Sequence, residues 1–261
     1  MALHDERTVL ERGTTPEGDI QLQTRRTPQG ELAYEIILNG VFIMASYNRE
    51  SERALATLAL EGRRDGFAQG APGESAGWRA HGTELVPPEG PPLRVLVGGL
   101  GMGYTLQAVL AWPRVAAVDV VEIEEPVIDW NRRYFGQLNA NALDDARVRL
   151  VRADMADWLA TAAGPYQAVC LDVDNGPHWL ARPENARLYG VRGLRRLRRL
   201  LGDGCILTVW SAGPDAAFQG RLRRVFGEVE ALRVPETDPW GHRAEPVIYR
   251  AVAGGPIPRS D

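Results

Sequence analysis

The chain has 261 residues, of which 44% are hydrophobic and 25% are charged, and its formal net charge is −4. This length and composition predict a globular protein with one large α/β domain and a modest appendage. No stretch approaches the roughly 18 uncharged apolar residues in a row that a membrane span needs. The net charge gives no reason to expect a nucleic acid partner.

The cysteines and histidines indicate the cellular compartment and limit the metal sites that the chain could form. The charged start MALHDERTVLERG is not typical of a secretory signal, and Cys170 and Cys205 lie in apolar runs typical of strands. We therefore expect two buried free thiols and a cytoplasmic protein. Two cysteines cannot supply an iron–sulfur cluster, and the four histidines share no ligand spacing, so we expect no metal.

The first fifty residues predict β structure. GDIQLQTR (18–25), ELAYEIIL (31–38) and VFIMASY (41–47) are strand-like, and Asn39-Gly40 between the last two is a strong hairpin signal. A helix from near Arg49 through SERALATLALEG completes a small N-terminal β-hairpin unit, which we assign to residues 1–62. The Gly/Pro-rich stretch 63–92 predicts a linker or mobile loop.

From residue 93 onward, apolar runs alternate with amphipathic segments, which is typical of a parallel sheet covered on both faces. The runs 228–234 and 246–253 have no full helix between them and predict a closing antiparallel pair. We therefore assign 93–261 to one α/β domain with a mostly parallel seven-stranded sheet. Its other predicted strands are 93–97, 115–122, 147–152, 166–173 and 205–210, and its predicted helices are 104–112, 126–138, 155–163, 184–201 and 214–226.

A glycine-rich sequence, VGGLGMGYTLQAVL (97–110), joins the first of these strands to the first helix. It does not fit the dinucleotide pattern G-x-G-x-x-G, because Tyr104 stands where the third glycine is needed. It also lacks the Gly-Lys-Ser/Thr of a phosphate-binding loop. A glycine turn followed by a helix and an acidic strand end favours S-adenosylmethionine, and a turn needed only for packing is the alternative. The candidate cofactor-binding glycines are Gly98, Gly99, Gly101 and Gly103.

Acidic residues follow the next strands at the same edge of the predicted sheet. Glu122 ends the second strand, about 20 residues after the glycines, where a carboxylate can accept both ribose hydroxyls. Asp154 follows the third strand and can receive the adenine amino group, with Ala153 flanking the ring. For Asp154 the alternative is an ordinary helix N-cap, and the two roles are compatible.

The fourth strand leads into LDVDNGPHW, which places Asp172 and Asp174 at its tip. Paired carboxylates can bind a cationic substrate or take a proton from a nucleophile, so we predict both as catalytic residues. The alternative is a turn stabilised by Asp and Asn side chains. Candidate walls of the substrate pocket, for which plain packing is the alternative, are Tyr104, His178, Trp179 and Tyr189.

The segment from about residue 93 to 210 resembles the spermidine synthase family, which has the Rossmann-like fold of class I methyltransferases. The residues that carry the resemblance are VLVGGLGMGYTLQAVL, VDVVEIEEPVIDWNRRYF, ALDDARVRLVRADMADWL and YQAVCLDVDNGP. The stretch LNGVFIMAS is similar to the small β domain that these enzymes place first. The resemblance implies transfer from S-adenosylmethionine, or its decarboxylated form, to a small-molecule acceptor, and it is compatible with a homodimer.

The chain departs from the family pattern at three places. Gly101 stands where the aminopropyltransferases keep an aspartate that anchors the amine of decarboxylated S-adenosylmethionine. SERALATLA replaces a Tyr-His/Gln-Glu cluster, and the second aspartate of an Asp-x-x-Asp pattern is displaced to Asp174. Losing a carboxylate from a buried ammonium site costs several kcal/mol of binding. We therefore expect methyl transfer from S-adenosylmethionine to a small acceptor, such as an amine. Aminopropyl transfer and a non-catalytic nucleoside-binding or assembly domain are the alternatives.

Two other motifs point elsewhere and are weaker. GESAG (73–77) matches the nucleophile elbow of serine hydrolases but lacks the flanking strand and helix that this motif needs. LRRLRRLLG (194–202) has leucines at helical spacing, which favours a helix with a solvated basic face over a nucleic acid site.

Overall fold

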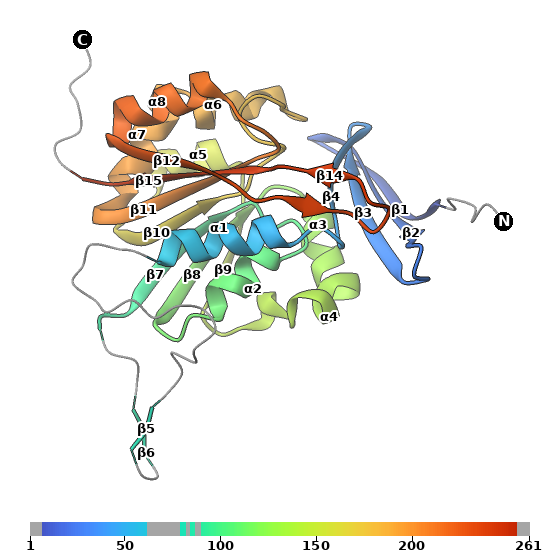
Figure 1. Ribbon diagram of the computed structural model, residues 1–261, viewed down its shortest axis with the longest axis horizontal. Coiled ribbons are helices and arrows are strands. Elements are labelled where there is room, and N and C mark those ends of the chain that lie inside the picture. The colour runs from blue at the N-terminus through green and yellow to red at the C-terminus, as the bar shows by residue number, and fades with distance from the viewer. Residues whose placement is uncertain (1–6, 62–78, 82–83, 87–89, 255–261) are drawn as a thin grey trace.

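The computed structural model describes residues 7–61, 79–81, 84–86 and 90–254. A four-stranded antiparallel sheet at the N-terminal side stands against one end of a seven-stranded sheet that carries helices on both faces (Figure 1). The seven-stranded, mostly parallel sheet with its antiparallel pair and the preceding hairpin sheet confirm the predicted fold class. Within the described ranges, no helix is long and apolar enough to cross a membrane.

The N-terminal sheet has the order β1-β2-β3-β4, with every neighbour antiparallel. The Asn39-Gly40 turn is confirmed, since both residues adopt positive φ angles of 51° and 75°. The first strand was not predicted, because most of its residues are exposed and the pairing shifts register between Val9 and Glu11. The strands are β1 (Arg7–Thr15), β2 (Gly18–Arg26), β3 (Leu32–Leu38) and β4 (Val41–Ala45).

The large sheet has the order β12-β15-β11-β10-β7-β8-β9. Its central strands are parallel, and β15 pairs antiparallel with both β11 and β12, as the spacing near the C-terminus predicted. The strands are β7 (Leu93–Gly98), β8 (Val115–Glu122), β9 (Val148–Arg152), β10 (Tyr166–Leu171), β11 (Leu201–Ser211), β12 (Glu228–Arg233) and β15 (Val247–Val252).

Helices cover the two faces of this sheet in separate groups (Figure 1). On one face α1 (Glu50–Leu60) packs against α2 (Tyr104–Leu110), β10, β11 and β15. The helix assigned to the N-terminal unit therefore contributes to the core of the large sheet. The other face carries α5 (Met155–Thr161), α6 (Ala186–Tyr189), α7 (Val191–Leu200) and α8 (Ala216–Phe226).

Two predicted helices are interrupted, each for a local reason. The helix over 126–138 is split into α3 (Glu125–Trp130), a π-helical turn (Asn131–Phe135) and α4 (Gly136–Asn139). The side chain of Asn131 donates to the carbonyls of Val127 and Gly101, which draws this wide turn towards the glycine loop. The helix over 184–201 breaks at Gly190, which is extended, and α7 ends where β11 begins.

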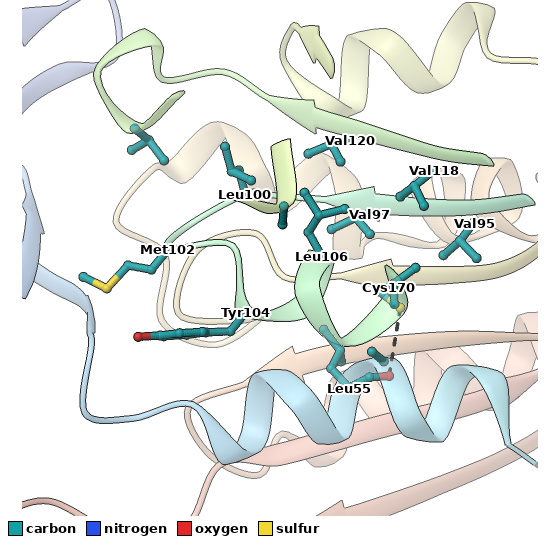
Figure 2. Close-up of a cluster of buried hydrophobic side chains, with 14 of the residues drawn as sticks. Leu55, Val95, Val97, Leu100, Met102, Tyr104, Leu106, Val118, Val120 and Cys170 are labelled. Atoms are coloured by element: carbon teal, nitrogen blue, oxygen red, sulfur yellow. Dashed lines mark hydrogen bonds between the residues drawn. The ribbon is translucent and has the colours of Figure 1, made fainter. Parts of the chain in front are cut away.

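The core begins directly behind the glycine loop. Figure 2 shows Leu100 and Met102 of the loop, Tyr104 of α2, and Leu55 of α1 packed with the inward side chains of β7 and β8. Cys170 lies in this cluster, and both cysteines are buried thiols outside any disulfide, as predicted. The loop is thus supported by a close-packed core, which holds its backbone in one conformation.

The stretch 63–92 falls largely outside the described residues, as does GESAG, so neither prediction on it is examined by the structure. Within it, the strands β5 (Arg79–His81) and β6 (Glu84–Val86) form an antiparallel pair. Near the C-terminus, β13 (Glu236–Thr237) and β14 (Arg243–Ala244) form a second short pair. Figure 1 places this pair beside the N-terminal sheet.

Candidate active site

A cavity lies where the carboxyl ends of β7, β8 and β10 meet the inner face of the N-terminal sheet. It encloses about 950 Å³ of space, part of it open to solvent. The N-terminal sheet forms an uncharged roof of Ile20, Ile36, Leu38, Ile43 and Met44. The predicted site residues that line the cavity are Gly99, Gly101, Glu122, Ala153, Asp172 and Asp174.

The glycine turn approaches the end of β10 closely. A Cβ atom on Gly99, whose φ is +88°, would stand 2.0 Å from the carbonyl oxygen of Asp172, so no side chain fits there. Gly103 begins α2 with a φ of 82°, and a Cβ there would meet the Asn139 side chain at 2.5 Å. Gly98 ends β7 behind the cavity lining, where a Cβ would meet Leu171 at 2.9 Å.

Glu122 organises this turn from the end of β8. One carboxylate oxygen accepts the Leu100 N–H at 2.8 Å, and the other accepts the Ile123 and Glu124 N–H groups at 2.7 and 2.8 Å. Burial raises the pKa of Glu122, and these backbone donors oppose the increase. Its carboxylate thus uses the N–H groups that a phosphate would need, and the oxygen that accepts only the Leu100 N–H among these three keeps a lone pair for a ligand hydroxyl.

Asp154 is the N-cap of α5, as its alternative role predicted. Its Oδ1 accepts the N–H groups of Ala156 and Asp157 at 2.8 and 3.0 Å, and it pairs with Arg187 at 3.1 Å. It is outside the cavity lining, whereas the neighbouring Ala153 lines it. A role for Asp154 towards an adenine ring remains a prediction.

Asp172 stands at the tip of β10 and lines the cavity. Its Oδ2 accepts the Thr105 hydroxyl of α2 at 3.2 Å. Burial raises the pKa of Asp172 to about 6, and the nearby Glu122 carboxylate adds to the increase while the Thr105 hydroxyl opposes it. A carboxylate with a pKa near neutrality is suited to accept and release a proton.

Asp174 holds the loop that follows β10. Its Oδ1 accepts the N–H groups of Asn175 and Ala181, and its Oδ2 accepts the Arg182 N–H and the Asn185 side chain, all within 2.6–2.9 Å. Its own φ is +66°, a conformation that aspartate tolerates. The structure therefore realises the alternative predicted for Asp174, a turn stabilised by its side chain, at a position that also borders the cavity.

We expect Asp174→Asn to act mainly on the stability of this loop. The amide nitrogen of the new asparagine would face N–H groups whose hydrogen bonds the carboxylate now accepts. A buried unsatisfied donor costs about 1–3 kcal/mol. Chemical denaturation should show the free energy of unfolding lowered by about that amount, with Asp157→Asn on the exposed start of α5 as the control. An unchanged midpoint together with lost turnover would instead return Asp174 to the catalytic residues.

Glu52 is a functional candidate that the sequence did not reveal. It lies in the first turn of α1, is 6% exposed, and lines the same cavity as Asp172. Burial raises the pKa of Glu52 well above its usual range, and the Asp172 and Glu236 carboxylates raise it further. Glu236 of β13 accepts the Ser51 N–H at 2.8 Å. The carboxylates of Glu52 and Asp172 thus share one cavity, where a cation is the ligand that would relieve their repulsion.

The structure places the four predicted pocket walls elsewhere. The Tyr104 ring lies in the core between α2 and α1 (Figure 2), and its hydroxyl donates to the Ser46 carbonyl at 3.1 Å. Tyr189 is buried and donates to the carbonyl of Val173. His178 and Trp179 lie exposed on the loop after β10. Tyr104 and Tyr189 therefore occupy packing positions, and His178 and Trp179 occupy loop positions.

Glu124 is a second buried acid at the end of β8. It is 5% exposed, lines the cavity, and neither of its carboxylate oxygens has a partner in hydrogen-bonding geometry. Burial raises the pKa of Glu124, and the nearby Thr15 and Arg182 offset this only in part. An orphaned carboxylate beside Glu122 fits a ligand that brings hydroxyl donors, as a ribose does.

A metal centre receives no support from the described part of the chain, where no three His, Cys, Asp or Glu side chains are grouped to hold an ion. Asp172 and Glu52 are two carboxylates on different elements, and Asp174 is directed into its own loop.

The strand order is that of a Rossmann-like α/β fold, and the cavity lies at the carboxyl ends of its strands, where such folds bind ligands. Residues 87–211 match the family model described as Spermine/spermidine synthase domain. This match confirms the predicted resemblance to a spermidine synthase-like family for the part of the chain that builds the glycine turn and the tips of β8 and β10.

Among curated proteins, putrescine N-methyltransferase 1 of Nicotiana tabacum is 42% identical over 82 residues, which cover 31% of this chain and 22% of that protein. A polyamine aminopropyltransferase of Saccharolobus islandicus is 26% identical over 147 residues, 54% of this chain and 48% of that protein. The chain thus aligns with about a fifth and about half of the lengths of these relatives.

Among solved structures, a spermidine synthase in complex with the transition-state analogue AdoDATO superposes with a TM-score of 0.69 at 16% identity, covering 94% of this chain and 74% of that one. Spermidine synthase from Thermotoga maritima gives a TM-score of 0.66, with 94% and 72% covered. At this identity the similarity establishes the fold.

Proposed function

We propose that this protein transfers a methyl group from S-adenosylmethionine to a small amine. The observation that carries the proposal is the convergence of Glu52 and Asp172 in a cavity that the glycine turn and Glu122 also line. The glycine turn and Glu122, which we call the donor end, suit a nucleoside with hydroxyl groups. Glu52 and Asp172, which we call the acceptor end, suit a cation. The putrescine N-methyltransferases and aminopropyltransferases that the chain resembles are named for amine substrates, which supports the same assignment.

The donor end fits S-adenosylmethionine on three features of the chain. Gly99 and Gly101 leave the backbone of the turn bare, Glu122 and Glu124 offer carboxylate oxygens to ribose hydroxyls, and Ala153 and Met155 border the cavity with small or flexible apolar groups. No basic side chain of the turn is available for a phosphate. When bound, S-adenosylmethionine supplies an electrophilic methyl carbon on a sulfonium.

The acceptor end is built to hold and deprotonate an ammonium group. An ammonium between Glu52 and Asp172 would compensate one buried and one half-buried carboxylate, which each lose hydration energy when they are left unpaired. With a pKa near 6, Asp172 is ionised at neutral pH and can take one proton from the ammonium, leaving a neutral amine. The aliphatic roof of the N-terminal sheet excludes water, and the fixed elements orient the acceptor.

Aminopropyl transfer is the second candidate, and one observation favours it. The cavity holds several carboxylates and one arginine, Arg182, so it attracts a more cationic donor such as decarboxylated S-adenosylmethionine. We rank it second because no carboxylate stands at position 101, beside the bare backbone of the glycine turn. A non-catalytic nucleoside-binding domain is the third candidate.

Calorimetry with the two donors separates these candidates. We expect S-adenosylmethionine to bind more tightly than its decarboxylated form. Tighter binding of the decarboxylated donor would exclude the methyltransferase assignment. Binding of the nucleoside product alone, without turnover of any amine, would favour the non-catalytic domain.

We expect Glu52→Gln to weaken acceptor binding and leave donor binding nearly intact. Truncating one partner of a buried charge pair costs about 2–5 kcal/mol, so KM for the amine should rise at least about 30-fold. The control is Glu50→Gln, because Glu50 is exposed in the same first turn of α1. Steady-state kinetics with each substrate varied in turn would detect the change. A reduced kcat with an unchanged KM would contradict a role in acceptor binding.

A further inference from the structure

Helix α1, which carries Glu52, takes its cap from a distant part of the chain. Its own N-cap residue is Arg49, a side chain with donors only, which cannot accept from the N–H groups of the first turn. The N–H group of Ser51 instead donates to Oε1 of Glu236 at 2.8 Å. An N-cap Ser, Thr, Asp or Asn ordinarily supplies such an acceptor, and a carboxylate is further favoured at the positive end of a helix. Glu236 therefore caps α1 from 185 positions along the chain.

Ser51 connects this cap to Glu52. It is fully buried, its N–H group donates to Glu236, and its hydroxyl donates to Oε2 of Glu52 at 3.1 Å. On the other side, the Thr105 hydroxyl of α2 lies 3.3 Å from the carbonyl oxygen of Glu52 and 3.2 Å from Oδ2 of Asp172. The direction of the Glu52 carboxylate thus depends on Ser51, and the position of Ser51 depends on Glu236.

The hairpin of β13 and β14 that carries Glu236 is anchored on the N-terminal sheet (Figure 1). Asp238 closes its turn by accepting the Trp240 N–H at 2.9 Å. The Arg25 guanidinium of β2 lies 3.5 Å above the centre of the Trp240 ring, and the Tyr47 ring meets that ring edge to face at 5.3 Å between centroids. Glu236 is therefore held in place from the same sheet that roofs the cavity.

We propose that Glu236 is a positioning residue for the acceptor end: by capping α1 it holds Ser51, and through the Ser51 hydroxyl it directs the Glu52 carboxylate into the cavity shared with Asp172. The inference rests on the proposed function, because it concerns the acceptor of that same site. Glu236 is not among the described residues that line the cavity, so it acts through Ser51 and not by contact with the acceptor.

Steady-state kinetics with putrescine as the probe amine tests this role. Glu236→Ala removes the acceptor of the Ser51 N–H, so KM for the amine should rise about tenfold, while kcat and donor affinity stay within about threefold. Glu236→Gln keeps an oxygen that accepts this N–H and removes only the charge, so KM should stay within about threefold of the wild-type value. The control is Glu245→Ala, because Glu245 follows the same hairpin and makes an exposed ion pair with Arg233.

Two further variants test the route through Ser51 and Glu52. In the Glu52→Gln background, Glu236→Ala should change KM by less than about threefold, because the carboxylate that it positions is gone. Ser51→Ala keeps the cap and removes the hydroxyl that reaches Glu52, so it should raise KM at least about threefold. This variant tests the inference even where Glu236→Ala does not fold.

Amide hydrogen exchange without any ligand tests the cap itself. We expect the Ser51 N–H to exchange at least about tenfold faster in Glu236→Ala than in the wild type or in Glu236→Gln. This measurement needs neither donor nor amine.

Each contrary result overturns the inference. Unchanged exchange in Glu236→Ala would show that Glu236 does not cap α1, and additive effects of Glu236→Ala and Glu52→Gln on KM would show that it does not act through Glu52. A Glu236→Gln protein that behaves like Glu236→Ala would assign the effect to charge, and an unchanged KM in Ser51→Ala would remove the route through its hydroxyl. All four leave methyl transfer standing. If the wild type bound no amine and methylated none, the proposed function would fail, and the acceptor role of Glu236 would fail with it.

Discussion

Replacing Asp172 by asparagine is expected to reduce kcat by about 10²–10⁴-fold, the usual contribution of a positioned general base. Asparagine keeps the size of the side chain and a carbonyl oxygen for the Thr105 hydroxyl, so the local structure should persist. What it removes is the group that accepts a proton from the acceptor ammonium. Donor affinity, measured by calorimetry, should change by less than about threefold, because the donor end is built from other residues.

The pH dependence of the wild type gives an independent view of the same residue. Burial raises the pKa of Asp172 to about 6, so the carboxylate form dominates above that pH and is lost as the pH falls through it. The rate should therefore rise with pH through about 6, and Asp172→Asn should lack this step. Asp129→Asn, at a surface position, is the control. Full turnover of Asp172→Asn would remove that residue from the mechanism.

Replacing Glu122 by alanine should have the largest effect on the site as a structure. The change leaves the N–H groups of Leu100, Ile123 and Glu124 without their acceptor, and each buried unsatisfied donor costs about 1–3 kcal/mol. We expect the free energy of unfolding to fall by about 3 kcal/mol or more, and the affinity for the nucleoside product to fall at least about 100-fold.

Denaturant unfolding and calorimetry with the nucleoside product would measure both effects. Glu125→Ala is the matched control, because Glu125 lies three residues after Glu122 and makes an exposed ion pair with Arg152. It should leave stability and affinity close to those of the wild type. Loss of stability without loss of product affinity in Glu122→Ala would show that Glu122 holds the turn but does not bind the ligand.

The parts of the site that follow a strand were predictable from the sequence. The order of apolar runs placed Glu122 and Asp172 at the same edge of the sheet as the glycine turn, and the structure brings all three to one cavity. This succeeds because parallel strands align their carboxyl ends, so a residue's position after its strand fixes its place in space. The Asn39-Gly40 hairpin was predictable because its dihedral requirement is local.

The missed residues depend on contacts between distant segments. Glu52 lies 120 positions before Asp172, on a helix that the sequence suggested belongs with the hairpin sheet, and only its packing on the large sheet brings the two acids together. Met44 reaches Gly101 across the interface between the sheets. The sequence offers only a weak indication of either residue. A glutamate at the start of an apolar helix and a methionine in a hairpin strand are each compatible with a purely structural role.

For Asp174 the sequence offers two roles, and its spacing from Asp172 does not decide between them. Its spacing from Asp172 places both at the strand tip, but the chain turns immediately afterwards, and four donors of the following loop take up its oxygens. The structure thus shows the loop-stabilising role, and the catalytic role stays a prediction. Tyr104 and Tyr189 are likewise buried, and their hydroxyls donate to backbone carbonyls.

The most direct test of the account is the mass of the product formed when the purified protein is incubated with a small aliphatic amine and both donors in equal amounts. Methyl transfer predicts an amine heavier by one methyl group together with S-adenosylhomocysteine, and loss of this product in Asp172→Asn. An amine heavier by one aminopropyl group, formed with methylthioadenosine, would contradict the account.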